Sequence, residues 1–164
     1  MAQNLHIIPL GGLGEIGKNM TVYEYGRNMI IVDCGVMFPE SDMYGIDLVL
    51  PDYRYVIENQ DKLRGIVITH GHMDHIAALP YLLRHVQAPI YGTPLTLGLI
   101  ERQLREKNVL ERAELIPMTQ GQPVQLGAFR VTPFAVAHSI PDSVGFVIDT
   151  PVGTVVHTGD YKLD

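Results

Sequence analysis

Residues 69 to 75 read T-H-G-H-M-D-H and place three imidazoles and a carboxylate directly after the apolar residues 66 to 68. Close-set rings lose solvation, repel one another when protonated and contribute little to packing. The cluster is therefore costly unless something in the site compensates for it. Its position, where a buried strand ends and a helix begins, can aim the side chains outward from a rigid base.

These residue types are ligands for divalent metal ions. Imidazole nitrogen and carboxylate oxygen both bind zinc-like ions at about 2 Å. His70 and His72 form an H-x-H turn that can share one ion, whereas the adjacent Asp74 and His75 point elsewhere and can hold a second. Alternatively, Asp74 only caps the helix and the histidines are surface residues. The density of the cluster at a strand end favours the metal site.

Ligands from one short segment would be an incomplete set, so more distant partners are expected. Two candidates stand at strand ends: His138 closes F-A-V-A-H and is followed by Ser139, and Asp160 closes V-V-H-T-G-D. Each residue alone would be interpreted as structural. Together with the cluster they form a set that converges from three strand ends, as active sites on rigid scaffolds do.

Elsewhere the chain alternates strand and helix patterns. Strands are expected over residues 5–10, 20–25, 29–33, 65–69, 89–91, 114–117, 123–126, 129–138, 144–150 and 154–160, and helices over residues 52–60, around 79–83 and over 93–106. Asp52 is the expected cap of the first helix, and Pro80 places the start of the second just after the cluster. Strand-rich ends around a mixed middle predict an α/β sandwich. The chain stops at Asp164 without a closing element, so we expect it to be incomplete.

Length and charge limit the function classes. A chain of 164 residues makes one domain, and its formal charge of −6 argues against a simple polyanion-binding surface. Bound cations would reverse that charge locally. The single cysteine, Cys34, excludes an internal disulfide framework and looks like a small buried strand residue. Without a signal sequence or a long apolar run, the protein is expected to be soluble and cytoplasmic.

A second motif competes with the metal interpretation. Residues 12 to 17 match G-x-G-x-x-G after a strand, and Asp33 lies at a tempting distance downstream. A dinucleotide site needs a helix that opens at the third glycine, whereas residues 21 to 25 have a strand pattern. We therefore interpret the glycines as a permissive loop that lies near a substrate.

The motifs together resemble a known family. The run H-G-H-M-D-H with the later His138 and Asp160 resembles the metallo-β-lactamase superfamily, whose αββα sandwich carries a dinuclear metal site. More narrowly, P-L-G-G-L-G-E-I-G-K-N-M, D-C-G-V-M-F-P, A-H-S-I-P-D-S and H-T-G-D-Y-K-L-D resemble the N-terminal part of the ribonuclease J family, of the β-CASP branch. These motifs span nearly the whole chain.

The resemblance implies a role for each matched residue. It implies that His70, His72 and His138 hold a first metal, that Asp74 and His75 hold a second, and that Asp160 bridges the two. Asp33 matches an early aspartate that steadies the histidine loop, and Ser139 matches a position near substrate phosphate. His157 is expected to be packed and hydrogen-bonded, and His6 and His85 to be incidental. Zn²⁺ is the first choice of metal, and Mn²⁺ suits the same ligands.

The sequence departs from the family pattern at two places. Met73 stands where the family often has Glu, and Ala77-Ala78 stands where a glycine is common. Neither change removes a ligand. The family's last metal-binding histidine, its β-CASP domain and its C-terminal domain would lie beyond Asp164, so residues 1–164 are expected to be the N-terminal part of a metallo-β-lactamase domain.

The function that the resemblance implies is a metal-dependent ribonuclease with 5′ exonucleolytic and endonucleolytic action on RNA. Two metals about 3.5 to 4 Å apart can clamp the attacking and leaving oxygens of an in-line displacement at phosphorus. Asp74 would also orient the nucleophile. The isolated chain is expected to be nearly inactive, and the full-length protein to be a homo-oligomer without membrane contact. The alternative is a hydrolase of the same superfamily that acts on a small thioester or lactone.

Overall fold

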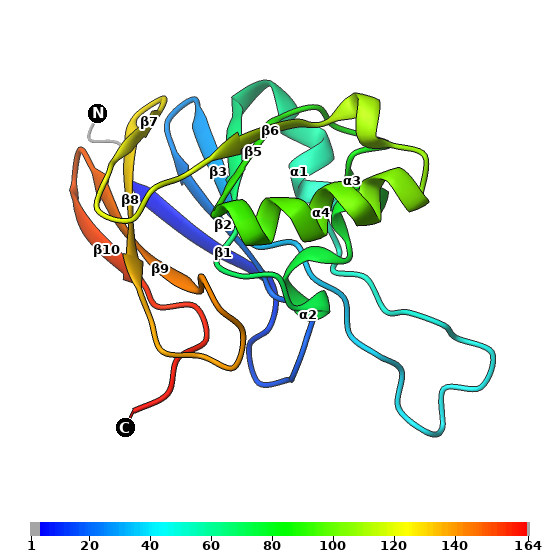
Figure 1. The fold of residues 1–164 in the computed structure, drawn as a ribbon. Helices are drawn as coiled ribbons and strands as arrows, with labels where there is room; N and C mark the ends of the chain where they lie inside the picture. Colours follow the sequence, from blue (N-terminus) through cyan, green and yellow to red (C-terminus); the bar gives the residue numbers. More distant parts are fainter. Residues whose placement is uncertain (1–3, 164) are drawn as a thin grey trace.

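A computed structural model describes residues 4–163, which form two β-sheets and one group of helices (Figure 1). The larger sheet has the order β1-β2-β3-β4-β5-β6, with strands Leu5–Gly11, Met20–Tyr25, Asn28–Val32, Leu63–Val67, Pro89–Gly92 and Glu114–Pro117. The smaller sheet has the order β10-β9-β8-β7, with β7 Val124–Leu126, β8 Phe129–Ala135, β9 Val144–Thr150 and β10 Gly153–His157. The helices are α1 Arg54–Glu58, α2 Met73–Ile76, α3 Leu79–Leu82 and α4 Pro94–Glu106, with 3-10 turns at Gln60–Lys62 and Leu110–Arg112.

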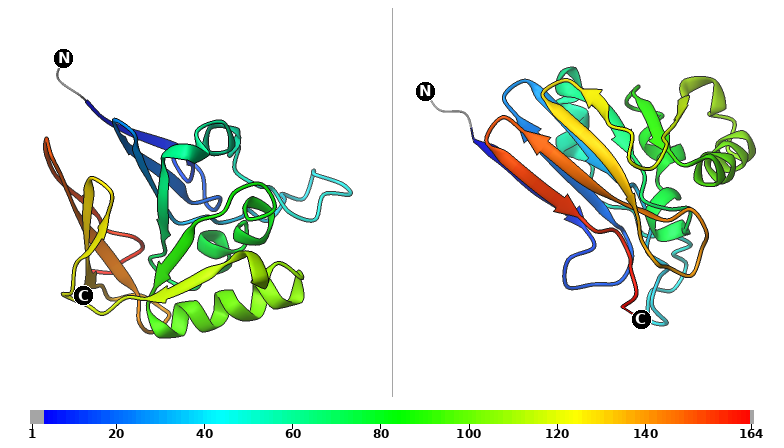
Figure 2. Two further views of the ribbon diagram at one scale, coloured as in Figure 1. Left: turned by 90° about the horizontal axis from the view of Figure 1, so that it is seen from above. Right: turned by 60° about the vertical axis from the view of Figure 1, so that its left-hand side comes forward.

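The three layers are stacked in the order small sheet, large sheet, helices (Figure 2). One apolar cluster, which includes Ile31, Ile66 and Leu79, fills the space between the large sheet and the helices. A second, which includes Val67 and Phe146, joins the two sheets. Alternation along β3 and β4 supplies both clusters, because successive side chains of a strand point to opposite faces. Both faces of the large sheet are therefore buried.

The direction of the strands determines where the histidine-containing segment, residues 69 to 75, lies. β3 to β6 pair in parallel, so the carboxyl ends of β3 and β4 meet at one edge of the large sheet. Asp33 follows β3, and the cluster of residues 69 to 75 follows β4. The last residues of the small sheet approach the same edge, with residue 138 after β8 and residue 160 after β10. Topology thus brings four loops to one place.

The predicted α/β fold class, a partial metallo-β-lactamase sandwich, is confirmed. Within residues 4–163, no helix covers the outer face of the small sheet, so three of the four expected layers are seen. The region also contains no helix that is long and apolar enough to span a bilayer.

The predicted helix after the cluster, with Pro80 near its start, is confirmed as α3, but it is preceded by a second short helix that the sequence did not separate from it. Residues 73 to 82 contain two short helices, and α2 begins at Met73 inside the cluster, with the extended His72 as its N-cap. Pro80 does lie in the first turn of the second helix, α3. Asp52 is not the N-cap of α1, which is Tyr53, although its carboxylate accepts a hydrogen bond from the backbone N–H of Arg54.

Two strands are shorter than expected. β8 ends at Ala135 and β10 ends at His157, so His138 and Asp160 stand on the loops that follow these strands. The bond from Val136 N–H to Ser143 O extends the β8–β9 register by one pair, whereas the bond from Lys162 N–H to Ala137 O belongs to neither ladder, so the chain has left the regular strands there. His138 and Asp160 nevertheless follow the ends of their strands, at the edge of the small sheet.

Candidate metal centre

Three ring nitrogens converge at the edge of the large sheet. His70 Nε2 lies 2.9 Å from His72 Nδ1, and His138 Nε2 lies 3.1 Å from the same His72 atom. His70 is buried, and the other two rings are partly exposed. Each nitrogen lies within 4.8 Å of the other two, and these three residues form a group that could hold one metal ion.

The tautomer of His70 follows from its neighbour. Thr69 is fully buried and its hydroxyl donates to Asp33, with Oγ1 to Oδ2 at 2.8 Å. Because the hydroxyl has a single proton, the 3.0 Å contact between Thr69 Oγ1 and His70 Nδ1 takes its proton from the ring. Nε2 of His70 therefore faces the other histidines with a free lone pair. Burial and the charge of His75 lower the pKa of His70 to about 4, which keeps the ring neutral, as a ligand must be.

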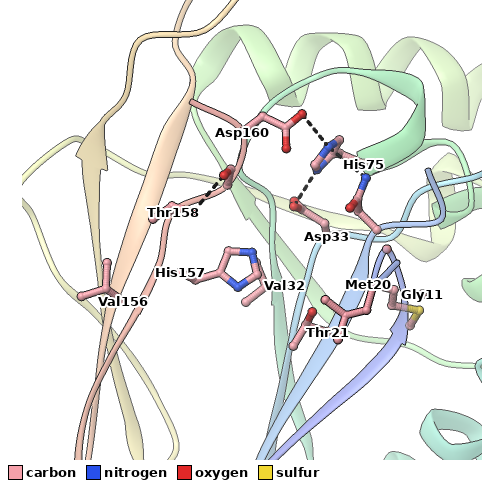
Figure 3. Close-up of a pocket in the computed structure, with 14 residues that line it drawn as sticks. Gly11, Met20, Thr21, Val32, Asp33, His75, Val156, His157, Thr158 and Asp160 are labelled. Atoms are coloured by element: carbon pink, nitrogen blue, oxygen red, sulfur yellow. Dashed lines mark hydrogen bonds and ion pairs between the residues drawn. The ribbon is translucent and has the colours of Figure 1, made fainter. Parts of the chain in front are cut away.

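A second group consists of His70, His75 and Asp160, whose donor atoms also lie within 4.8 Å of one another. Figure 3 shows the carboxylate of Asp160 pointing toward one side of the His75 ring, with Asp33 on the other side. Asp160 Oδ2 lies 3.5 Å from His75 Nε2 and 3.8 Å from His138 Nε2. Asp160 therefore stands between the two groups, with its side chain 46% exposed.

Asp33 holds His75 through the ring nitrogen Nδ1, on the side away from Asp160. Its Oδ2 atom lies 2.8 Å from His75 Nδ1, and its Oδ1 atom accepts the backbone N–H of Thr69 at 2.8 Å. Burial opposes a charge on His75, but the carboxylates of Asp33 and Asp160 outweigh it and raise the pKa of His75 to about 10. The hydrogen bond from His75 lowers the pKa of Asp160 to about 2. The carboxylates thus favour a positive charge at the second group, which a metal ion bound there would supply in place of the ring proton of His75.

Asp74 lies beside His75 but outside both three-residue groups. Its Oδ2 atom lies 3.6 Å from His75 Nε2, and its side chain is 31% exposed. Asn19 donates from Nδ2 to the backbone carbonyl of Asp74 at 3.1 Å and to its Oδ2 atom at 3.3 Å. The sequence pattern identified neither Asn19 nor Thr69. Each is an uncharged residue whose only signal is that it adjoins the glycine loop or the cluster.

The remaining candidates fall outside the centre. Ser139 is exposed in the loop after His138, and among residues 4–163 no hydrogen bond reaches its side chain. His157 Nδ1 lies 2.9 Å from the hydroxyl of Tyr23, so it is packed and hydrogen-bonded as expected. His6 and His85 are exposed, and neither belongs to a candidate metal group.

A cavity of about 380 Å³ opens beside the second group. His75 and Asp160 contribute to its wall from one side, and Gly11 and Thr21 from the β1–β2 side (Figure 3). The cavity gives a small polar molecule room next to the carboxylate of Asp160.

Comparison with known proteins identifies relatives over nearly the whole chain. Residues 28–163 match the family model described as "Beta-lactamase superfamily domain". The chain is 45% identical over 162 residues to ribonuclease J 2 of Staphylococcus saprophyticus and 46% identical over 158 residues to ribonuclease J 1 of Streptococcus pyogenes. These matches cover 99% and 96% of the chain but only 29% and 28% of the relatives. The similarity that the motifs predicted is confirmed, and the chain spans less than a third of the length of these relatives.

Solved structures show the same fold. The metallo-beta-lactamase fold protein YhfI from Bacillus subtilis aligns with a TM-score of 0.70 at 19% identity, over 99% of this chain and 65% of that one. A protein of unknown function from Enterococcus faecalis aligns with a TM-score of 0.74 at 19% identity, over 99% and 44%. With its two packed sheets and its histidine groups at their shared edge, the chain belongs to the beta-lactamase superfamily.

Proposed function

We propose that residues 1–164 form the N-terminal part of a metallo-β-lactamase domain in a metal-dependent ribonuclease, which hydrolyses RNA phosphodiesters by 5′ exonucleolytic and endonucleolytic action. The identity of about 45% to ribonuclease J relatives supports the substrate class. The observation that carries the chemistry is that two groups of donor atoms, His70-His72-His138 and His70-His75-Asp160, each meet within 4.8 Å.

The donor set fits two divalent cations. His70, His72 and His138 would hold the first, and His75 with Asp74 would hold the second, with Asp160 between them. Thr69 and Asp33 each bond the outer nitrogen of one ring and leave its Nε2 atom toward the centre. Such bonds fix the tautomer and orientation of metal-binding histidines. Four histidines and two carboxylates suit Zn²⁺, and Mn²⁺ accepts the same ligands.

The chain's own residues would supply binding, orientation and proton handling. Two divalent cations at this site would supply a nucleophile from water at neutral pH and neutralise the charge that develops on phosphate oxygens. Asp74, partly exposed beside His75, would orient the attacking water. Ser139, exposed next to His138, would contact a phosphate oxygen of the substrate. The cavity beside Asp160 gives the reacting group space.

Hydrolysis of labelled RNA tests this proposal. The assay uses the 164-residue chain and the longer protein that we propose contains it, each loaded with Zn²⁺ or Mn²⁺, against 5′-labelled RNA and a panel of thioesters and lactones. We expect metal-dependent RNA cleavage by the longer protein, very little cleavage by the chain alone, and no turnover of the panel. His72→Ala is expected to remove the activity.

The control is His85→Ala, because this histidine is exposed and lies outside both groups. It is expected to leave cleavage unchanged. Hydrolysis of a thioester or lactone without RNA cleavage would identify a small-molecule hydrolase of the same superfamily instead. Equal RNA turnover by the chain alone and by the longer protein would contradict the proposal that these residues are only part of the active unit.

A further inference from the structure

The glycine-rich segment between β1 and β2 folds back on itself and against the cluster. A Cβ atom at Gly11 would lie 2.3 Å from the carbonyl oxygen of Lys18, and one at Gly12 would lie 2.6 Å from Oδ1 of Asn19. Gly12 and Gly17 also have φ angles of 85° and 95°, in the region that favours glycine. No helix opens at the third glycine, so the segment does not form a dinucleotide site. The glycines instead allow the close return that brings Asn19 to α2.

Asn19 occupies a specific position in the candidate metal centre. Its Nδ2 atom donates to the backbone carbonyl of Asp74 at 3.1 Å and to its carboxylate at 3.3 Å, and lies 3.1 Å from His75 Nε2. Two of these three contacts reach Asp74, one at its backbone carbonyl and one at its carboxylate. Asn19 is partly buried and draws the Asp74 carboxylate toward His75.

We propose that Asn19 is a positioning residue that holds Asp74 in place for the second cation. The fold of the glycine-rich segment would place the Asn19 side chain beside Asp74. The inference rests on the proposed function, because it needs the second cation to bind there. Asp74 is part of a helix of only four residues and has an exposed carboxylate, so without the amide it would turn toward solvent. Loss of a residue that orients a metal ligand typically weakens metal affinity about 10- to 100-fold.

The role of the side chain is separable from that of the backbone. The backbone N–H of Asn19 donates to Asp74 O at 3.1 Å, and the backbone N–H of Gly35 donates to Asn19 O at 3.0 Å. Neither bond involves the side chain, so Asn19→Ala and Asn19→Leu keep the groups that make both. These variants therefore keep the backbone contact between the glycine-rich segment and α2 and lose the side-chain hydrogen bonds to Asp74.

Calorimetric titration with Zn²⁺ of the metal-free longer protein that we propose contains this chain tests the proposal, because that protein also supplies the ligands expected beyond Asp164. Asn19→Ala removes the amide, and Asn19→Leu removes it while keeping most of its volume. We expect the unchanged longer protein to bind two ions. In both variants we expect the first ion to bind as before and the second to bind about 10- to 100-fold more weakly. A double-mutant cycle with Asp74→Ala should show that Asn19→Ala has no further effect once the carboxylate is gone.

The matched control is Asn28→Ala, since Asn28 also bonds another side chain, that of Arg64, on the opposite end of β3. It is expected to leave both affinities unchanged. Unaltered binding of the second ion in the Asn19 variants, or equal weakening in Asn28→Ala, would overturn the inference. Binding of one ion or none by the unchanged longer protein would refute the two-metal centre of the proposed function, and the inference with it.

Discussion

At Asp33 the backbone enters the left-handed region, with φ of 62°, directly after β3 ends. Aspartate tolerates this conformation better than most residues. The turn points its carboxylate at Thr69 and His75, and its side chain is only 3% exposed. Burial disfavours the charge, but His75 outweighs burial and holds the pKa of Asp33 below its usual range. One residue thereby fixes both ends of the cluster.

Asp33→Asn tests this role at the scale of one residue. The amide tolerates the same φ and keeps the shape, but it loses the charge that pairs with the buried His75. We expect a loss of about 3 kcal/mol in the free energy of unfolding, measured by urea denaturation without metal. The control is Asp61→Asn, whose exposed pair with Arg27 should cost about 0 to 1 kcal/mol. Equal costs at the two positions would contradict the assigned role.

The sequence alone predicted some residues of the candidate metal centre but not others. His70, His72, His138 and Asp160 were predicted to meet because titratable side chains gathered at strand ends, and the structure brings them together. Asn19 acts through one uncharged amide, 55 residues before Asp74 in the sequence, and its position depends on how the glycine-rich segment folds back. No local pattern encodes such a contact.

Among the elements, α2 depends on close contact with the segment after β3. A Cβ atom at Gly35 would lie 1.5 Å from the carbonyl oxygen of Asp74, and the backbone N–H of Cys34 donates to the carbonyl of His75 at 2.8 Å. We expect Gly35→Ala to displace α2 and to lower the free energy of unfolding by more than about 3 kcal/mol, measured by urea denaturation.

A glycine with open space around it is the comparison. Gly98 lies on the exposed side of α4, where an added Cβ meets no atom within 4 Å. Gly98→Ala should raise the free energy of unfolding by about 1 kcal/mol, because alanine has a higher helix propensity. If both substitutions stabilised the chain, Gly35 would not be under the constraint described here.

The same contact explains why the helix after the cluster was predicted imperfectly. Apolar spacing indicated a helix near residues 79 to 83, but Pro80 and the contacts of Cys34 divide the region into two short helices. The backbone N–H of Ala78 bonds to Cys34 O instead of continuing the turns of α2. Tertiary hydrogen bonds therefore overrode the helical pattern, whereas the strands of the large sheet followed theirs.

The link between β2 and α1 provides a pH-dependent prediction. Glu24 is 8% exposed, and it accepts hydrogen bonds from Lys62 at 2.9 Å and from Tyr55 at 2.7 Å. Burial opposes its ionisation, but these bonds outweigh burial and lower the pKa of Glu24 below the ordinary value of 4.5. A lowered pKa in the folded state contributes stability above the unfolded pKa, and this is lost as the pH falls through the folded pKa.

We therefore expect Glu24→Gln to cost about 1 to 3 kcal/mol at pH 7. The difference from the unchanged chain should shrink below about pH 4.5, measured by urea denaturation over a pH series. The control is Glu106→Gln, whose exposed pair with Arg102 should cost only about 0.3 to 0.5 kcal/mol. A Glu24→Gln cost that stays constant down to low pH would show that ionisation of Glu24 does not stabilise the fold.

For the whole molecule, the candidate metal centre lies where two sheets meet. His70, His72 and His75 follow β4 of the large sheet, whereas His138 and Asp160 follow strands of the small sheet. The two layers are joined by the apolar cluster between the sheets and by a few hydrogen bonds, such as that from Val144 N–H to Thr69 O at 3.0 Å. A cation held by residues of both sheets would therefore tie the two layers together, and its binding energy would appear as stability of the entire fold.

Metal titration of unfolding tests this coupling. At a Zn²⁺ concentration of about 100 Kd, a ligand that binds only the folded state raises the free energy of unfolding by about 2.7 kcal/mol. We expect such a rise in the unchanged chain and its removal by EDTA. His138→Ala should abolish most of it while changing metal-free stability little, because that ring is partly exposed on a loop. His85→Ala, exposed and outside both groups, should keep the full rise. If His138→Ala and Asp160→Ala both kept the full rise, metal would bind within the residue 70 to 75 segment alone, and the sheets would not be joined through it.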